Sequence, residues 1–312
     1  MVSEFHKMKI LVTGSNGLLG QKLVLALKER ADMQVMACGR GENRIGDSSG
    51  YEYFPLDLTD ETAVKELVRQ YTPDCIIHTA AMTNVDACEL DPEACRKANV
   101  EAVTYLLDAC KGTDVHFIHI STDFVFNGES GPYRETDPIG PLSVYAASKA
   151  EAEDKVMNSG LRWAILRTMI IYGVTDDAQR SNIVLWTKRS LEKGQNIRVI
   201  SDQYRGPTLA EDLAQACIST ALRKAEGLFH VSGREVISIL DIAIQVADFF
   251  GLDKRYIHPV TTAELKQPAL RPLRTGFIID KAMRELDFHP HSLEEGLAIV
   301  KAQLERRQAT QA

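Results

Sequence analysis

The sequence lacks the features that mark membrane, secreted or metal-dependent proteins. No run approaches the roughly 20 consecutive apolar residues that span a bilayer, and residues 1–8 are polar and short, without the apolar stretch of a signal peptide. The six cysteines form no CxxC pair, and no histidine has a partner at metal-ligand spacing. We therefore expect a soluble cytoplasmic protein with reduced thiols and no metal site.

A strong charge of one sign is absent as well. The chain has 36 Lys and Arg against 43 Asp and Glu, a net charge of -7, which argues against nucleic acid or an anionic membrane as the main partner. Internal repeats and low-complexity segments are also missing. With 312 residues, 45% of them hydrophobic, the chain is long enough for one large domain or two unequal ones.

What the sequence does contain is an alternation of short apolar runs with longer amphipathic stretches. The predicted strands of the first half are 9–13, 34–38, 52–56, 74–79, 115–121 and 163–167. The predicted helices between them are 18–30, 61–71, 92–111 and 141–159. This order is typical of βαβ units, so we predict an α/β fold with a doubly wound parallel sheet of the Rossmann type. Ligands of such a sheet lie outside the carboxyl ends of its strands.

The alternation loosens after Thr168. Further helices are predicted at 181–193, 209–224, 239–250 and 293–306, with short strands at 197–200 and 228–231. A proline-bearing stretch covers 258–273. We assign residues 1–168 and 195–225 to the NAD(P)-binding Rossmann domain. Residues 169–194 and 226–312 are assigned to a smaller, partly interleaved C-terminal substrate-binding domain, the cap.

A glycine-rich turn, Gly14-Ser15-Asn16-Gly17-Leu18-Leu19-Gly20, follows the first predicted strand and opens a helix. Gly14 suits a tight turn, Gly17 lets the backbone approach a pyrophosphate, and Gly20 lets the helix pack closely on the strand. The helix N-terminus then offers free N–H groups and a positive dipole to the phosphates. The alternative is a glycine-rich turn without a ligand, but its place after the first buried strand favours a dinucleotide site.

The end of the second strand bears on the choice of cofactor. NAD-binding proteins usually carry an acidic residue there for the ribose 2′-hydroxyl, whereas this chain has Gly39 followed by Arg40. A guanidinium pairs with a 2′-phosphate, which favours NADP(H), with NAD(H) as the other candidate. The alternative for Arg40 is a solvated charge in a loop.

Tyr145 and Lys149 form a YxxxK pair within a predicted helix. The spacing of four places both side chains on one helix face. A nearby ammonium lowers the pKa of a phenol, so Tyr145 could give a proton to a carbonyl oxygen, while Lys149 could also hold the nicotinamide ribose. YxxxK alone is common by chance. It gains weight because Thr122 and Asp123 end the strand before it, where they could hold a substrate carbonyl and hydroxyl.

With these motifs in order, the chain resembles the extended short-chain dehydrogenases, and within them the dTDP-4-dehydrorhamnose reductase family, from Lys9 to about Leu304. Further segments resemble that family: Asp57-Leu58-Thr59-Asp60, the stretch from His78 to Asp86, Asn99, Arg167-Thr168 with Tyr172-Gly173, Asp202-Gln203 with Pro207-Thr208, and Arg271-Pro272. The resemblance implies an NAD(P)H-dependent reduction of the C4 ketone of a nucleotide-linked 4-keto-6-deoxy sugar. The nucleotide sugar is then the expected partner, and a homodimer is compatible with the sequence.

The resemblance also implies the site residues. Thr122, Tyr145 and Lys149 are the expected catalytic residues. The expected cofactor contacts are Gly14, Asn16, Gly17, Leu18, Leu19, Gly20, Arg40, Asp57, Leu58, Ala80, Ala81, Met82, Asn99, Tyr145 and Lys149. The expected substrate contacts are Thr122, Asp123, Ile170, Arg205 and Arg271.

The chain departs from the family at the sugar pocket. Ile170 stands where the family often has a tryptophan, and Phe124 and Asn127 replace a tyrosine and an aspartate. Arg205 stands where glycine is usual, and its guanidinium is expected to meet either a phosphate or water. These changes bear on the substrate rather than on hydride transfer.

Two other functions remain open. A nucleotide-sugar epimerase or dehydratase would share the fold. However, dehydratases of this superfamily usually carry an Asp-Glu pair after the catalytic threonine, and here Phe124 follows Asp123. Some relatives of these reductases bind NADP and act as non-catalytic regulatory subunits. The complete set of Thr122, Tyr145 and Lys149 weighs against that role.

Overall fold

The computed structural model describes residues 7–177 and 181–311 and contains a seven-stranded sheet in which all neighbours are parallel. Its strands are β1 (Met8–Thr13), β2 (Met33–Gly39), β3 (Glu52–Pro55), β4 (Cys75–His78), β5 (His116–Thr122), β6 (Arg162–Thr168) and β11 (Gly227–His230). The order is β11-β6-β5-β4-β1-β2-β3, so the direction of winding reverses between β1 and β4. The predicted doubly wound sheet is therefore confirmed, and this reversal marks the place where such sheets bind ligands.

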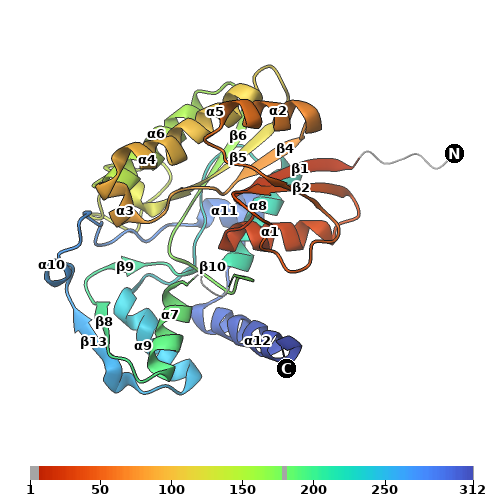
Figure 1. Cartoon of the computed structure of the whole chain (residues 1–312). Coiled ribbons are helices and arrows are strands. Elements are labelled where there is room, and N and C mark those ends of the chain that lie inside the picture. Colours follow the sequence, from red (N-terminus) through yellow and green to blue (C-terminus); the bar gives the residue numbers. More distant parts are fainter. Residues whose placement is uncertain (1–6, 178–180, 312) are drawn as a thin grey trace.

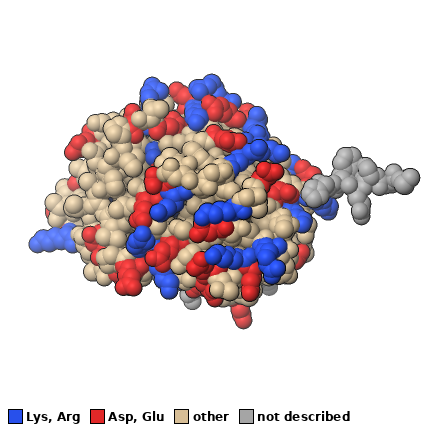
Figure 2. All heavy atoms as spheres, turned by 90° about the horizontal axis from the view of Figure 1, so that it is seen from above, with Lys and Arg blue, Asp and Glu red and all other residues tan. Residues whose placement is uncertain are grey.

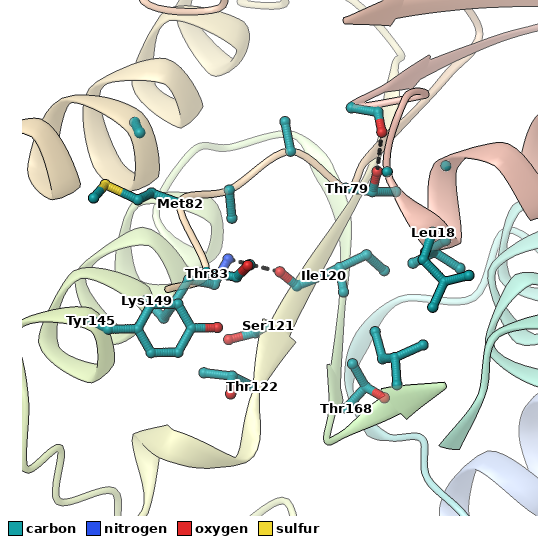
Figure 3. Close-up of a pocket in the computed structure, with 18 of the residues that line it drawn as sticks. Leu18, Thr79, Met82, Thr83, Ile120, Ser121, Thr122, Tyr145, Lys149 and Thr168 are labelled. Atoms are coloured by element: carbon teal, nitrogen blue, oxygen red, sulfur yellow. Dashed lines mark hydrogen bonds between the residues drawn. The ribbon is translucent and has the colours of Figure 1, made fainter. Parts of the chain in front are cut away.

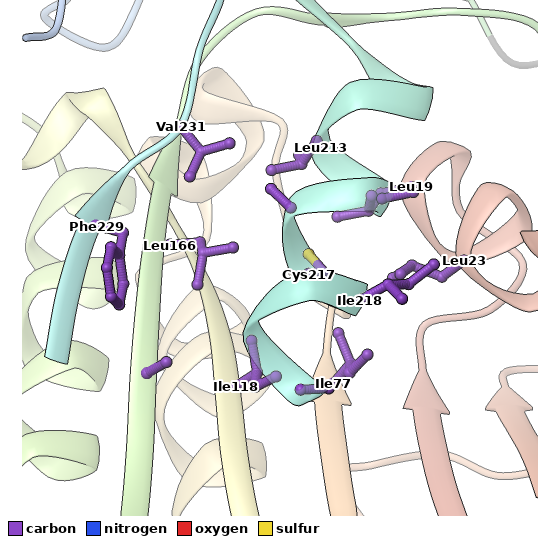
Figure 4. Close-up of a cluster of buried hydrophobic side chains, with 14 of the residues drawn as sticks. Leu19, Leu23, Ile77, Ile118, Leu166, Leu213, Cys217, Ile218, Phe229 and Val231 are labelled. Atoms are coloured by element: carbon purple, nitrogen blue, oxygen red, sulfur yellow. The ribbon is translucent and has the colours of Figure 1, made fainter. Parts of the chain in front are cut away.

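Helices cover both faces of the sheet (Figure 1). One face carries α1 (Leu18–Lys28), α8 (Ala210–Arg223) and α11 (Asp280–Leu286). The other carries α2 (Glu61–Tyr71), α5 (Ala102–Ala109) and α6 (Val144–Met157). Figure 4 shows α8 beside α1 on this face of the sheet, where Leu213, Cys217 and Ile218 point into the core. Burial of these apolar faces fixes α1 and the glycine turn before it against the sheet.

A second lobe lies at the carboxyl edge of the sheet (Figure 1). Its larger helices are α7 (Ile183–Glu192), α9 (Ile239–Phe250) and α12 (Leu293–Gln311). Three strand pairs accompany them: β8 (Ile197–Ile200) with β13 (Ile257–Val260), β7 (Ile171–Tyr172) with β10 (Thr208–Leu209), and β9 (Tyr204–Arg205) with β12 (Ile237–Ser238). The remaining short elements are α3 (Val85–Leu90), α4 (Pro92–Arg96), α10 (Thr262–Leu265) and the 3-10 turns η2 (Asp123–Val125) and η3 (Lys254–Tyr256).

The strand pairing differs from the expected division of the chain at two places. β11, which was expected in the cap, is the edge strand of the central sheet and pairs with β6. β8, which was expected in the Rossmann domain, pairs with β13 in the second lobe. Both segments are short apolar runs, and such runs do not show from their own residues which sheet they join.

The expected single helix over 92–111 is interrupted. The structure has α4, then a π-helical turn η1 (Lys97–Glu101), then α5. Asn99 lies within the π-helical turn, and such turns often accompany functional sites. Helices α3 and α11 were not expected from the sequence.

The face over α2, α5 and α6 carries basic and acidic side chains interspersed (Figure 2). Ion pairs join Lys65 with Glu61 and Arg96 with Glu151 there. Within residues 7–177 and 181–311, no helix has the length and apolar character to cross a membrane, and no group of three His, Cys, Asp or Glu side chains is placed to hold a metal ion. All six cysteines are free and buried.

Candidate active site

A cavity of about 790 Å³ opens at the carboxyl ends of the central strands, beside the point where the sheet reverses. Residues of both lobes line it. Every residue that the sequence predicts for the site lies on its wall except Asn99. The structure thus brings together residues that are spread from Gly14 to Arg271 in the chain.

The glycine turn forms one end of the cavity. Gly14 has φ +71°, and a Cβ there would lie 2.7 Å from the backbone nitrogen of Ala80. A Cβ on Gly20 would overlap the carbonyl oxygen of Gly14, which shows how closely α1 approaches the turn. Gly17 precedes α1 and caps it with no side chain, so the free N–H groups of the first helical turn face the cavity where Leu18, Leu19 and Gly20 line it. These features fit a pyrophosphate.

Asn16 shapes the loop that follows β2. Its amide nitrogen donates to the carbonyl oxygens of Arg40 (3.2 Å) and Glu42 (2.9 Å), and its oxygen accepts from the backbone nitrogen of Arg44 (2.9 Å). Arg40 is exposed at the cavity rim. Arg44 also lines the cavity and pairs with Asp177 at 2.8 Å. Arg44 was not predicted, although a second arginine four residues after Arg40 is visible in the sequence.

Asn99 has a different place from the one expected. It is buried behind the cavity wall, where its oxygen accepts from the backbone nitrogen of Met82 (2.7 Å). Its amide nitrogen donates to the carbonyl oxygen of Met82 (3.1 Å) and to the hydroxyl of Ser148 (3.0 Å). Asn99 therefore does not line the cavity in this structure, and it holds the lining residue Met82 in place.

Tyr145 and Lys149 lie on one face of α6, whose first turn is capped by the Ser143 side chain. Figure 3 shows the phenol oxygen of Tyr145 pointing toward Ser121 and Thr122 at the end of β5. Burial raises the pKa of the Tyr145 phenol, and its hydrogen bond with Thr122 offsets this only in part. The phenol is therefore protonated at neutral pH, which suits a proton donor.

The ammonium of Lys149 is almost fully buried. It donates to the carbonyl oxygen of Ile120 at 2.8 Å and to Nε2 of His119 at 3.0 Å. Burial lowers the pKa of Lys149 to about 8. The expectation that this ammonium lowers the pKa of Tyr145 is not met, because desolvation of the phenol dominates.

Asp123 and Arg205 form a buried ion pair with an N···O distance of 3.0 Å, each side chain being 3% exposed. Thr275 donates a hydrogen bond to the same carboxylate. Arg205 also donates to the carbonyl oxygens of Tyr204, Pro272 and Leu273. It is thus not a guanidinium that faces water, and it joins the second lobe to the end of β5.

Two further predicted substrate contacts, Arg271 and Ile170, also line the cavity. Arg271 forms a bidentate pair with Asp86 at 2.8 and 3.0 Å, which attaches the late loop to α3. Ile170 lines the cavity with φ +36°. A positive φ is strained for a β-branched residue, and such strain is often found at ligand sites.

Taken together, a glycine turn at the reversal of a parallel sheet and a buried tyrosine and lysine facing the same cavity define the extended short-chain dehydrogenases and reductases. The family model described as RmlD substrate binding domain matches residues 8–306. The chain therefore belongs to this family, which confirms the resemblance inferred from its motifs.

Individual relatives include proteins named as reductases and one named as a subunit of an adenosyltransferase. The probable low-salt glycan biosynthesis reductase Agl14 of Haloferax volcanii is 32% identical over 299 residues, covering 95% of this chain and 98% of that one. Methionine adenosyltransferase 2 subunit beta of Xenopus laevis is 30% identical over 312 residues, covering 90% and 91%. The dTDP-4-dehydrorhamnose reductase of Aggregatibacter actinomycetemcomitans is 30% identical over 310 residues, covering 95% and 99%.

Among solved structures, the dTDP-4-dehydrorhamnose reductase of Bacillus anthracis in complex with NADP superposes with a TM-score of 0.81. It is 26% identical and covers 95% of this chain and 99% of its own.

Proposed function

We propose that this protein is an NADPH-dependent reductase that acts on the C4 ketone of a nucleotide-linked 4-keto-6-deoxy sugar. The observation that carries the proposal is the common cavity of Thr122, Tyr145 and Lys149 with the Gly14–Gly20 turn. The names of the relatives support it, since a dTDP-4-dehydrorhamnose reductase matches over almost the whole chain.

The cofactor would lie with its pyrophosphate on the first turn of α1 and its adenine near Asp57 and Leu58, which line the same end of the cavity. Arg40 and Arg44 supply positive charge for a 2′-phosphate at the rim, in keeping with the NADP in the Bacillus anthracis relative. When bound, NADPH supplies the hydride.

The protein's own residues handle the proton. Tyr145 is protonated at neutral pH and points to the end of β5, so it can give its proton to the oxygen of a ketone held by the Thr122 hydroxyl. The ammonium of Lys149, one helical turn away, would stabilise the phenolate that remains once the proton has left, although burial sets the pKa of the resting phenol. A buried cavity wall strengthens each of these interactions because it excludes water.

The test is an absorbance assay of NADPH consumption with a panel of nucleotide 4-keto-6-deoxy sugars, for the wild type and Tyr145→Phe. We expect one or more sugars to be reduced, and we expect Tyr145→Phe to lower kcat by at least about a hundredfold, the usual contribution of a general acid. NADPH affinity should stay within about twofold, because Tyr145→Phe keeps the ring and removes only one of the many groups that line the cavity. Turnover that survives in Tyr145→Phe would remove the phenol from the mechanism.

A second function is favoured by one observation. Methionine adenosyltransferase 2 subunit beta of Xenopus laevis is as similar to this chain as the Aggregatibacter reductase, at 30% identity. A regulatory subunit would bind NADPH, reduce no sugar of the panel, and change the kinetics of a methionine adenosyltransferase added to it. In that case Tyr145→Phe would leave the effect on the partner unchanged.

A further inference from the structure

Lys149 has two protein acceptors for its ammonium. The carbonyl oxygen of Ile120 lies 2.8 Å from Nζ, a bond visible in Figure 3, and Nε2 of His119 lies 3.0 Å away. An ammonium has three N–H groups, so one is left for the cavity that Lys149 lines. Because two of the N–H groups of Lys149 are held by acceptors on the same strand, the direction of the third N–H group is fixed.

His119 is held rigidly on β5. It is fully buried and stands in register with His78 on β4, and the two rings lie 5.4 Å apart at 15°. His78 is fixed in turn by Thr13 of β1, whose hydroxyl lies 2.7 Å from Nδ1. Three neighbouring strands therefore place the imidazole that meets Lys149.

Both imidazoles are neutral at physiological pH. Burial lowers the pKa of His78 to about 3 and that of His119 well below its usual value, and the charge of Lys149 acts in the same direction. A neutral imidazole has one ring nitrogen free to accept a hydrogen bond. Nε2 of His119 accepts the hydrogen bond from Lys149, and the ring proton of His119 lies on Nδ1. Lys149 then carries the positive charge of this network.

We propose that His119 is the positioning residue that keeps Lys149 protonated and directed at the cavity. The inference rests on the proposed function, in which Lys149 acts as an ammonium. The other titratable groups near Lys149 are Glu153 and Tyr145 on α6, Cys95 on α4 and His78 on β4. Among the described residues His119 and Ile120 accept hydrogen bonds from Nζ, and His119 is the one whose acceptor a substitution can remove.

Removing this acceptor should shift the titration of Lys149. A buried ammonium with one acceptor fewer releases its proton at lower pH, because hydrogen bonds to the charged form stabilise it. His119→Leu removes the acceptor, whereas His119→Gln keeps a side-chain acceptor of similar reach. His116→Leu is the matched control, since His116 lies on the same strand but bonds to the carbonyl oxygen of Ala225.

The experiment measures the pKa of Lys149 directly by NMR of ¹³Cε-labelled lysine, assigned with Lys149→Arg, and the alkaline limb of kcat by the NADPH assay. In His119→Leu we expect both midpoints to fall by about one pH unit or more, since a hydrogen bond to a charged group is worth at least about a tenfold change in equilibrium. His119→Gln and His116→Leu should stay within about half a pH unit of the wild type.

The outcomes separate the two proposals. If His119→Leu folds and leaves the Lys149 pKa at the wild-type value, the positioning role is overturned even when the enzyme is active. If the wild type reduces no sugar, the proposed function fails, while the NMR titration still decides whether His119 controls the charge of Lys149. A fall in the pKa with His119→Gln equal to that with His119→Leu would also contradict the role, because the acceptor would then be irrelevant.

Discussion

At the scale of single residues, we expect the choice between the two dinucleotides to depend on Arg40. It is exposed at the rim of the cavity, and Gly39 before it offers no carboxylate to a ribose hydroxyl. Arg44 stands nearby, but Asp177 already pairs with its guanidinium. We therefore expect Arg40 to supply most of any selectivity for a 2′-phosphate.

Replacing Arg40 tests this assignment. Arg40→Ala should weaken NADPH binding by about tenfold, the value of one charge-assisted hydrogen bond, and should leave NADH binding unchanged. Isothermal titration of both dinucleotides measures the effect, with the exposed Arg69→Ala on α2 as the control. Tighter binding of NADH than of NADPH by the wild type would contradict the account.

Several residue contacts could not be predicted from the sequence. Asp123 and Arg205 were both expected to face the substrate, and the structure pairs them with each other. Arg271 is likewise paired with Asp86. Sequence motifs show which residue types gather at a site, but partners from distant segments are chosen by the tertiary fold.

At the scale of elements, the Gly14–Gly20 turn requires glycine because another backbone segment approaches it closely, and not only because glycine is flexible. Gly14 at φ +71° lies against the backbone of Ala80. Gly112 has a similar φ of +75°, but a Cβ added there would have no atom within 4 Å. The two positions therefore separate the cost of a positive φ from the cost of a collision.

Alanine substitution at the two glycines should give different results. Gly112→Ala should lower the free energy of unfolding by about 1–2 kcal/mol, the cost of a left-handed conformation. Gly14→Ala should cost more than this, and it should also weaken NADPH binding by at least about tenfold because the turn must move away from Ala80. Urea unfolding and dinucleotide titration measure both effects. Equal losses of stability, with NADPH binding intact, would show that the close approach has no role.

Elements whose apolar residues repeat with a clear period were predictable, and elements that depend on contacts with distant segments were not. The helices over 61–71 and 239–250 and the strand over 197–200 were predicted with the bounds that the structure has, because their apolar residues repeat with a clear period. Helix α3 is only six residues long, and it is stabilised by the Asn84 cap and the contact of Asp86 with Arg271. A contact with a distant loop leaves no pattern in the local sequence from which the helix could be predicted.

At the scale of the whole molecule, ion pairs join the two lobes around the cavity. Asp123 with Arg205 lies inside it, and Arg44, which also lines it, pairs with Asp177 at 2.8 Å. The doubly wound sheet was predictable from the alternation of strands and helices. The sheets that β8 and β11 join were not predictable, because they depend on which partner strand lies beside each of them.

Buried neutral histidines make the stability of the fold sensitive to acid. Burial lowers the pKa of His78 and His230 to about 3, and it also lowers the pKa of His116 and His119. In the unfolded chain these groups take up protons near pH 6.5, so the stability present above that pH is lost as the pH falls toward 3. The raised pKa values of Asp123 and Asp212 act in the opposite direction.

We expect the free energy of unfolding to fall by more than about 1.4 kcal/mol per pH unit below pH 6, which corresponds to an uptake of more than one proton. Urea unfolding at pH 6.0, 5.5 and 5.0 gives this slope. His230→Gln should reduce the slope by close to one proton, since it removes one buried imidazole. A free energy of unfolding that stays constant over this range would show that the histidines are not neutral and buried as described.

The central claim is that Tyr145 and Lys149 act on a ketone beside a dinucleotide laid over the Gly14–Gly20 turn. The most direct measurement uses NADPH deuterated at C4 of the nicotinamide, followed by mass spectrometry of the sugar product. The account predicts one deuterium at the former ketone carbon with the wild type and none above background with Tyr145→Phe. If no nucleotide 4-keto sugar acquires deuterium with the wild-type protein, the assignment of this cavity as a reductase active site is wrong.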